Sequence, residues 1–166
     1  RRQLEKTIKH QAAHDTLTDL LNRDAFEHEL TEAIYDVIDS ERRHMLCHLD
    51  LERFKLVNDT AGHSAGDQCL IQITSIIESC VRSEDIVARL GGDEFAVLMP
   101  GCDWMEVAVM TENIEKLLDF AREYGYEDRV DGYISKCDLC LDIRKYLAAQ
   151  QDFVELRPKA FYAHLT

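Results

Sequence analysis

The sequence has little glycine, little proline and a shortage of cationic side chains. Its 7 glycines and 2 prolines among 166 residues exclude collagen-like and low-complexity chains. With 19 Lys and Arg against 32 Asp and Glu, the net charge is −13, so the chain lacks the basic face that binders of nucleic-acid polymers need. No apolar run approaches the roughly 20 residues of a membrane-spanning helix. A nucleotide site is still compatible with this charge, because a divalent cation can mediate between carboxylates and phosphates.

The length predicts one domain that buries a core without the help of metals or disulfides. Four of the six cysteines are scattered, several in apolar contexts, which indicates buried thiols in a reducing compartment and predicts a cytoplasmic domain. The pair Cys137-x-x-Cys140 is half of a metal knuckle, and a metal site there is a weaker alternative. Because the chain starts with Arg1 and not with Met, we expect it to be part of a longer protein.

The pattern of apolar residues predicts an α/β fold with a central, mainly antiparallel sheet flanked by helices. Helices are expected at residues 1–14, 24–40, 69–81 and 104–124, a strand at 45–51, and a β-hairpin at 86–90 and 95–99. Residues 15–23 form a capped loop in this interpretation, and 52–67 an irregular segment. Beyond residue 125 we expect a loop at 131–140, helices at 141–149 and 158–165, and no further long strand. The resulting division is a linker helix at 1–14, the domain proper at 15–124 and an atypical tail at 125–166.

The strongest local signal is Arg89-Leu-Gly-Gly-Asp-Glu-Phe95 at the turn of the predicted hairpin. The glycines allow positive φ and let a ligand approach the backbone. Since neighbouring strand residues point to opposite faces, one of Asp93 and Glu94 would bind a metal and the other would face a partner or support the fold. An ordinary turn with solubilising acidic residues is the alternative.

Two further stretches carry polar groups suited to a nucleotide. Asp50 ends the predicted strand, and with the hairpin carboxylates it would form a hard-oxygen site for Mg²⁺, while Lys55 could neutralise phosphate charge. The alternative here is a charged loop after an edge strand. Asn58 and Asp67 offer the donors and acceptors that read a purine edge, and Asp67 suits the N–H groups of guanine. The alternative for this stretch is a loop of turn-forming residues in which Asp67 caps the next helix.

Four motifs in order resemble the GGDEF domain of bacterial diguanylate cyclases over about residues 11–117. They are Asp15-x-Leu-Thr-x-Leu-x-Asn-Arg23, Asp50-x-Glu-x-Phe-Lys-x-x-Asn58-Asp, Gly62-His-x-x-Gly-Asp67 and Arg89-x-Gly-Gly-Asp-Glu-Phe95. The resemblance implies a two-fold homodimer in which each domain holds one GTP. The 3′-hydroxyl of each nucleotide attacks the α-phosphate of the other, yielding cyclic di-GMP and pyrophosphate.

The resemblance also implies roles for individual residues. Mg²⁺ or Mn²⁺ would be held by Asp50, Asp93, Glu94 and the Leu51 carbonyl. The catalytic groups would be Asp93, Glu94 and Lys55. Substrate would be bound by Asn58 and Asp67 at the guanine, by Phe54 and Lys55 along the phosphates, and by the Gly91-Gly92 backbone. Arg82-x-x-Asp85 matches the family's inhibitory product site for cyclic di-GMP, with a surface ion pair as the alternative.

The chain also departs from the family. Position 19 is Asp where glycine is usual, and the family's final strand and basic helix have no matching pattern after Trp104. Residues 118–165 resemble, less specifically, the C-terminal tail of radical SAM proteins, which predicts a chimera. The alternative function is therefore an impaired GGDEF module that only binds GTP or cyclic di-GMP. We expect the N-terminal helix to connect to an upstream sensor domain.

Overall fold

The computed structural model describes residues 2–40, 42–51, 54–123 and 134–142. The elements are α1 (Arg2–Ala13), α2 (Arg23–Asp39), β1 (His44–Leu51), α3 (Phe54–Ala61), α4 (His63–Cys80), β2 (Ile86–Gly91), β3 (Glu94–Pro100), α5 (Trp104–Glu123) and β4 (Ile134–Asp142). Among the helices of these residues, none combines the length and the apolar character needed to cross a membrane.

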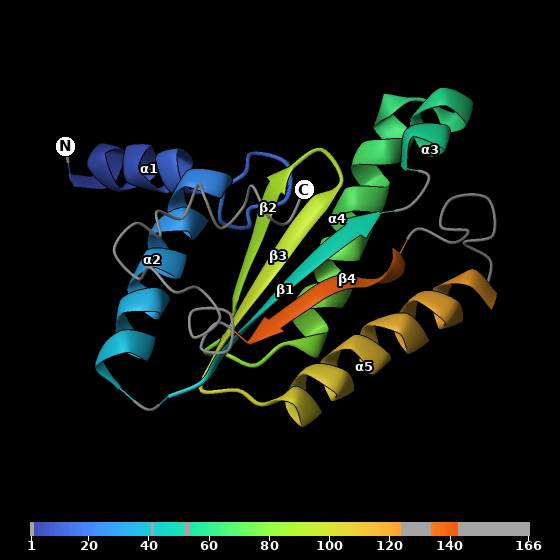
Figure 1. Ribbon diagram of the computed structural model, residues 1–166. Helices are drawn as coiled ribbons and strands as arrows, with labels where there is room; N and C mark the ends of the chain where they lie inside the picture. Colours follow the sequence, from blue (N-terminus) through green and yellow to red (C-terminus); the bar gives the residue numbers. More distant parts are fainter. Residues whose placement is uncertain (1, 41, 52–53, 124–133, 143–166) are drawn as a thin grey trace.

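One sheet organises the described part of the chain. Its strand order is β2-β3-β1-β4, and each neighbouring pair is antiparallel. Helix α2 covers one face, and α4 and α5 cover the other (Figure 1). The prediction of an α/β fold with a mainly antiparallel sheet flanked by helices is therefore confirmed.

Strand β1 is the centre of the core because both of its faces are covered. Met45, Cys47 and Leu49 pack into the cluster below α4 and α5, while Leu46 packs into the cluster below α2. This alternation is the period-2 pattern of an extended strand. Burial raises the pKa of the Cys47 thiol to about 12, so this side chain behaves as a small apolar group.

Helix α2 confirms the helix predicted at residues 24–40. Asn22 caps it, since its side-chain oxygen accepts a hydrogen bond from the Ala25 N–H at 3.0 Å. The buried stripe facing the sheet consists of Phe26, Leu30, Ala33, Ile34 and Val37. Ile38, the residue after Val37, is 53% exposed because it points away from that stripe.

The prediction of an irregular segment at 52–67 is wrong for the described residues from 54 onward, which are largely helical. Residues from Phe54 onward form α3, because Phe54 and Val57 bury their side chains and outweigh the turn-forming residues around them. Helix α4 begins at His63, ahead of the predicted start at Cys69, with Gly62 as its N-cap. The alternative of Asp67 as a helix cap is therefore wrong, since that residue lies inside α4.

The prediction of a loop at 131–140, with no further long strand, is wrong. Residues Ile134–Asp142 form β4, which pairs antiparallel with β1 from Leu51↔Ile134 to Met45↔Asp142 and has register irregularities around Leu49. Without β4, β1 would be an edge strand with unpaired backbone groups, which a ladder satisfies. The prediction of a helix at 141–149 is wrong for its first two residues, which belong to β4. The rest of that segment and the helix predicted at 158–165 lie outside the described residues.

Candidate functional site

The predicted carboxylates come together where β1 ends beside the turn between β2 and β3. Asp50 lies directly opposite Glu94 in the β1–β3 ladder. The next residue, Leu51, donates its backbone N–H to the carbonyl of Asp93 at 3.3 Å. Three of the predicted metal-binding positions, together with Leu51, therefore meet at one corner of the sheet.

The glycine turn leaves this corner open. Gly91 and Gly92 have φ of 142° and 54°, conformations that other residues adopt rarely. A Cβ added at either position would meet no atom within 4 Å, so the space beside the backbone is unfilled. The guanidinium of Arg89 steadies the turn by donating to the Gly92 carbonyl from Nε at 3.0 Å and Nη2 at 2.7 Å.

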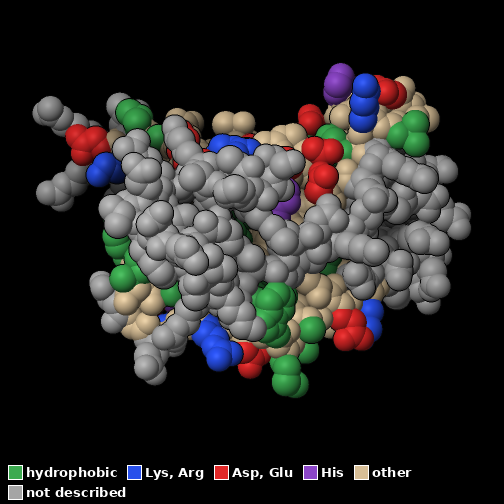
Figure 2. Space-filling model, in the orientation of Figure 1, with side chains coloured by type: hydrophobic (Ala, Val, Ile, Leu, Met, Phe, Trp, Pro, Cys, Tyr) green, Lys and Arg blue, Asp and Glu red, His purple; other side chains and the backbone are tan. Residues whose placement is uncertain are grey.

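Two of the carboxylates face the same side of the sheet. Directly paired residues of antiparallel strands hold their Cβ atoms about 4.5–5.5 Å apart, and like charges there repel each other. Asp50 and Glu94 are each partly exposed, and acidic side chains are visible over this region in Figure 2. Carboxylate oxygens brought together in this way suit a hard divalent cation, so the residues present fit the predicted Mg²⁺ or Mn²⁺.

Arg23 is a part of this corner that the sequence argument did not assign. Its Nη2 lies 3.3 Å from Glu94 Oε2, and its Nε donates to the carbonyl of Leu90 at 3.0 Å. Glu94 thus faces a partner on α2, as the alternation of strand side chains led us to expect for one of the two acidic residues. The available signal was the place of Arg23 at the end of the first quoted motif, next to the cap residue Asn22.

A second wall is formed by α3 and the start of α4. Gly66 is buried, and a Cβ there would collide with Oδ1 of Asn58 and lie 3.3 Å from Cζ of Phe54. The Asn58 amide therefore lies against Gly66, the residue just before Asp67. Asp67 and Lys55 are exposed, whereas Phe54 is buried with its ring near Gly66.

The loop after α1 is tied to the hairpin through one ion pair. Arg89 Nη1 lies 3.0 Å from Asp15 Oδ1, and the Thr18 backbone and hydroxyl donate to the same oxygen at 2.9 and 2.7 Å. Burial of the Asp15 carboxyl favours its neutral form, but the hydrogen bonds from Thr18 and Arg89 outweigh that effect. The pKa of Asp15 is consequently held below its ordinary value.

Arg82 and Asp85 meet at the opposite end of the hairpin, where β2 begins and β3 ends. Arg82 Nη2 donates to Asp85 Oδ1 at 2.8 Å, and the backbone N–H of Arg82 donates to Asp85 Oδ2 at the same distance. The Asp85 side chain is fully buried, while that of Arg82 is 31% exposed. Hydrogen bonding to Asp85 raises the pKa of Arg82 above its ordinary value.

A cavity of about 390 Å³ adjoins this pair. Arg82, Asp85 and Glu106 supply its charged wall, and the other lining residues are Cys80, Met99, Met105, Val109 and Met110. The guanidinium also reaches Glu106 Oε1 at 3.1 Å and the Pro100 carbonyl at 3.0 Å. An arginine that lines a largely apolar cavity can meet an anionic ligand with a flat aromatic part.

Comparison with protein families decides where this arrangement belongs. The family model described as "Diguanylate cyclase, GGDEF domain" matches residues 12–135, about three quarters of the chain. This chain belongs to the GGDEF family. The match extends beyond residue 117, where the quoted motifs end, and it includes the first two residues of β4.

Curated relatives of this GGDEF domain are much longer proteins. It is 46% identical over 102 residues to the probable diguanylate cyclase DgcE of Escherichia coli, a match that covers 61% of this chain and 9% of DgcE. It is 43% identical over 109 residues to the cyclic di-GMP phosphodiesterase PdeB of Shewanella oneidensis, covering 63% of this chain and 12% of PdeB. The chain therefore corresponds to a small part of each of these relatives.

Solved structures place the fold in the same family. The coiled coil and GGDEF domain of DgcB from Caulobacter crescentus, in complex with c-di-GMP, matches with a TM-score of 0.65 and 34% identity. That match covers 68% of this chain and 59% of the other. Nothing in these comparisons supports the resemblance of residues 118–165 to radical SAM proteins, so the chimera stays a prediction.

Proposed function

We propose that this GGDEF domain condenses two GTP molecules into cyclic di-GMP. In each half-reaction a 3′-hydroxyl oxygen bonds to the α-phosphorus of the other nucleotide, and the bond to the β-phosphate breaks to release pyrophosphate. One domain holds one nucleotide in this scheme, so the working form is a homodimer with the two sites facing each other. The family membership and the relatives named as diguanylate cyclases support the proposal.

The observation that carries the proposal is the corner where Asp50 faces Glu94 and Asp93 bonds to Leu51. We assign Asp50, Asp93, Glu94 and the Leu51 carbonyl to binding Mg²⁺ or Mn²⁺. Such an ion would neutralise phosphate charge and lower the pKa of the attacking hydroxyl. Asp93 and Glu94 are the proposed catalytic carboxylates, and the open Gly91-Gly92 backbone gives the phosphates room.

We assign guanine recognition to Asn58 and Asp67. Gly66 holds the Asn58 amide next to the start of α4, and Asp67 is exposed there, so the two side chains can share one base edge. Phe54 supports this wall, and exposed Lys55 is assigned to the phosphates as a cationic catalytic group.

A second candidate function is a module that binds GTP or cyclic di-GMP without turnover. The cavity beside Arg82 and Asp85 favours it, because this cavity lies at the end of the hairpin away from the carboxylates. We assign Arg82 and Asp85 to binding cyclic di-GMP in both functions, as the product in the first and as the ligand in the second. We also propose a cytoplasmic location. An upstream sensor domain joined through α1 is a further proposal, and the much greater length of the relatives accords with it.

The deciding experiment is incubation of the chain with GTP and Mg²⁺, followed by chromatography for cyclic di-GMP and pyrophosphate. The double variant Asp93→Ala, Glu94→Ala runs alongside. Product from the parent alone supports the cyclase. Binding of GTP or cyclic di-GMP without product supports the binding module, and neither product nor binding contradicts both functions.

A further inference from the structure

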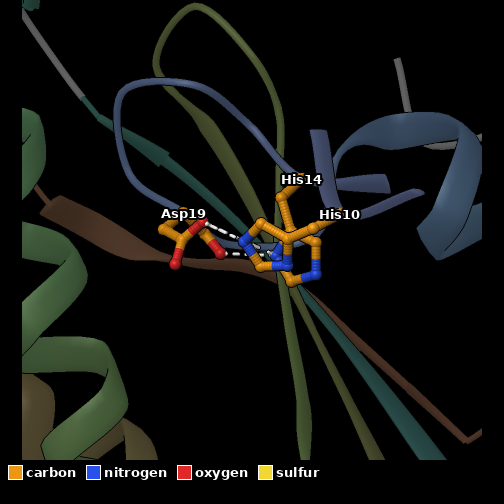
Figure 3. A group of neighbouring side chains, drawn as sticks. All are labelled: His10, His14 and Asp19. Carbon is orange, nitrogen blue, oxygen red and sulfur yellow. Dashed lines mark hydrogen bonds and ion pairs between the residues drawn. The ribbon is translucent and has the colours of Figure 1, made fainter. Parts of the chain in front are cut away.

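A cluster of metal-ligating side chains lies outside the proposed active site, where α1 meets the loop that follows it. His10 and His14 are one helical turn apart, and their rings stack with centroids 3.8 Å apart. Asp19 approaches them from the loop, as Figure 3 shows. The three side chains therefore converge from two segments on one point.

The distances suit a common ligand. Asp19 Oδ1 lies 2.8 Å from His10 Nε2 and 4.0 Å from His14 Nδ1. One ligand atom of each residue lies within 4.8 Å of the other two. A tetrahedral zinc ion with bonds of about 2.0–2.1 Å needs ligand atoms about 3.3–3.5 Å apart. The separations of 2.8 and 4.0 Å lie on either side of this value, so both imidazole rings must turn to share an ion.

The backbone at Asp19 supports a role for its carboxylate. Among the described residues, Asp19 is the one non-glycine residue with positive φ, at 61°. Glycine adopts this conformation more readily than a residue with a side chain. This chain thus places a carboxylate, in an unfavourable backbone conformation, within reach of two imidazoles.

We propose that His10, His14 and Asp19 bind a divalent transition-metal ion, with Zn²⁺ as the best match. Two imidazole nitrogens and one carboxylate oxygen form a donor set that Zn²⁺ accepts and that Mg²⁺, which prefers oxygen ligands, does not select. His14 Nδ1–H donates to the Asp19 carbonyl at 2.6 Å in the metal-free arrangement, so binding requires the proton of this ring to move to Nε2.

The ion would fix the direction in which α1 leaves the domain. The side chains of His10 and Asp19 are 52% and 77% exposed, so the ion has an entry path from solvent. The Asp19 N–H donates to the Asp15 carbonyl at 2.9 Å, and Asp15 pairs with Arg89 of the hairpin. A metal at the cluster therefore ties α1 to the loop that holds the turn of the hairpin.

Equilibrium dialysis of the whole chain against Zn²⁺, with excess Mg²⁺ present to occupy hard-oxygen sites, tests the proposal. The parent should bind one Zn²⁺ more than the variant Asp19→Gly or the variant His10→Gln. If a variant still binds this ion, its affinity should be about tenfold or more below that of the parent. Asp19→Gly is a sharp control because it removes the carboxylate and relieves the positive-φ backbone, so misfolding does not explain the loss. Equal zinc binding by the parent and both variants would overturn the proposal.

Two further measurements separate this site from cysteine sites. The double variant Cys137→Ser, Cys140→Ser should keep the additional Zn²⁺, and Co²⁺ bound at the cluster should give no sulfur-to-metal charge-transfer absorption. Zn²⁺ should also slow tryptic cleavage after Lys9 in the parent and leave the rate unchanged in Asp19→Gly. Loss of the additional Zn²⁺ in the cysteine variant, or equal protection in Asp19→Gly, would overturn the proposal.

Discussion

The two ends of the β2–β3 hairpin handle acidic side chains in opposite ways. At the base, the carboxylate of Asp85 is fully buried and receives hydrogen bonds from the guanidinium and the backbone of Arg82. At the turn, Asp50, Asp93 and Glu94 are only partly buried and surround a glycine backbone with open space beside it. Glu94 is paired there with Arg23, and the distance between Nη2 and Oε2 is longer, at 3.3 Å.

This contrast separates an end whose charge is neutralised within the fold from an end whose carboxylates are open to a metal ion. A buried carboxylate paired with arginine is neutralised inside the fold, and removing one partner leaves an uncompensated charge. Directly facing carboxylates repel each other, which favours a cation beside them, such as Arg23 beside Glu94 or a bound metal ion. The base therefore stabilises the hairpin and adjoins a cavity, whereas the turn gathers the groups that we assign to metal and triphosphate.

The largest expected effect comes from removing one carboxylate at the turn. Asp50→Asn should reduce cyclic di-GMP formation by about 100-fold or more, since even outer partners of metal ligands contribute about 10–100-fold. It should also weaken the rise in melting temperature that Mg²⁺ produces in the parent. Product assays and thermal unfolding with and without Mg²⁺ check both expectations.

The matched control is Glu112→Gln, which removes one negative charge from an exposed i,i+4 pair with Lys116 on α5. It should leave the Mg²⁺ response and the product yield as in the parent. An equal loss in both variants would mean that net charge, and not the corner at the turn, controls metal binding.

The next effect is on stability at the base. Arg82→Ala should lower the free energy of unfolding by roughly 3 kcal/mol, because it leaves the fully buried Asp85 carboxylate without its guanidinium. Denaturant titration measures the change. The double variant Arg82→Ala, Asp85→Ala should recover part of the loss, since no buried charge remains. A double variant less stable than the single one would show that packing, not charge, dominates at the base.

A smaller effect is expected at the wall beside the turn. Gly66→Ala should lower the free energy of unfolding by about 1–3 kcal/mol, because the new methyl group collides with Asn58. GTP affinity should fall with it, since the Asn58 amide must move. Ser64→Ala, at an exposed position of the same helix, should change stability by less than about 0.5 kcal/mol. Similar values for the two variants would contradict the close packing of Asn58 on Gly66.

The smallest effect concerns the ion pair between Asp15 and Arg89. The pKa of Asp15 is lower in the folded protein than in the unfolded chain, where it is about 3.9. The ionised carboxylate therefore stabilises the fold above a pH of about 3.9, and this stabilisation is lost as the pH falls through the lower pKa of the folded protein. Asp15→Asn should lower the free energy of unfolding by about 1 kcal/mol at neutral pH. The difference from the parent should shrink toward zero in acid, and a difference that is independent of pH would contradict this assignment.

Elements with a strong local pattern were predicted from the sequence, and elements without one were not. The hairpin was predicted within a residue at each end of its strands, because two apolar runs flank a Gly-Gly turn. Helix α3 was missed, because its turn-forming Asn58 and Asp59 obscured the short buried pair Phe54 and Val57. Strand β4 was missed because its residues show no clear alternation, and the pairing partner β1 lies more than 80 residues earlier.

The sequence by itself determined the family, the order of the main elements and the chemical identity of the corner residues, since short motifs carry these locally. Only the tertiary structure decided which groups face each other: Asp50 across from Glu94, Arg23 beside Glu94, and Asp19 against His10. These contacts join residues from separate elements, and ladder register and loop conformation set them. Local periodicity carries no information about such register, so folding in three dimensions had to supply it.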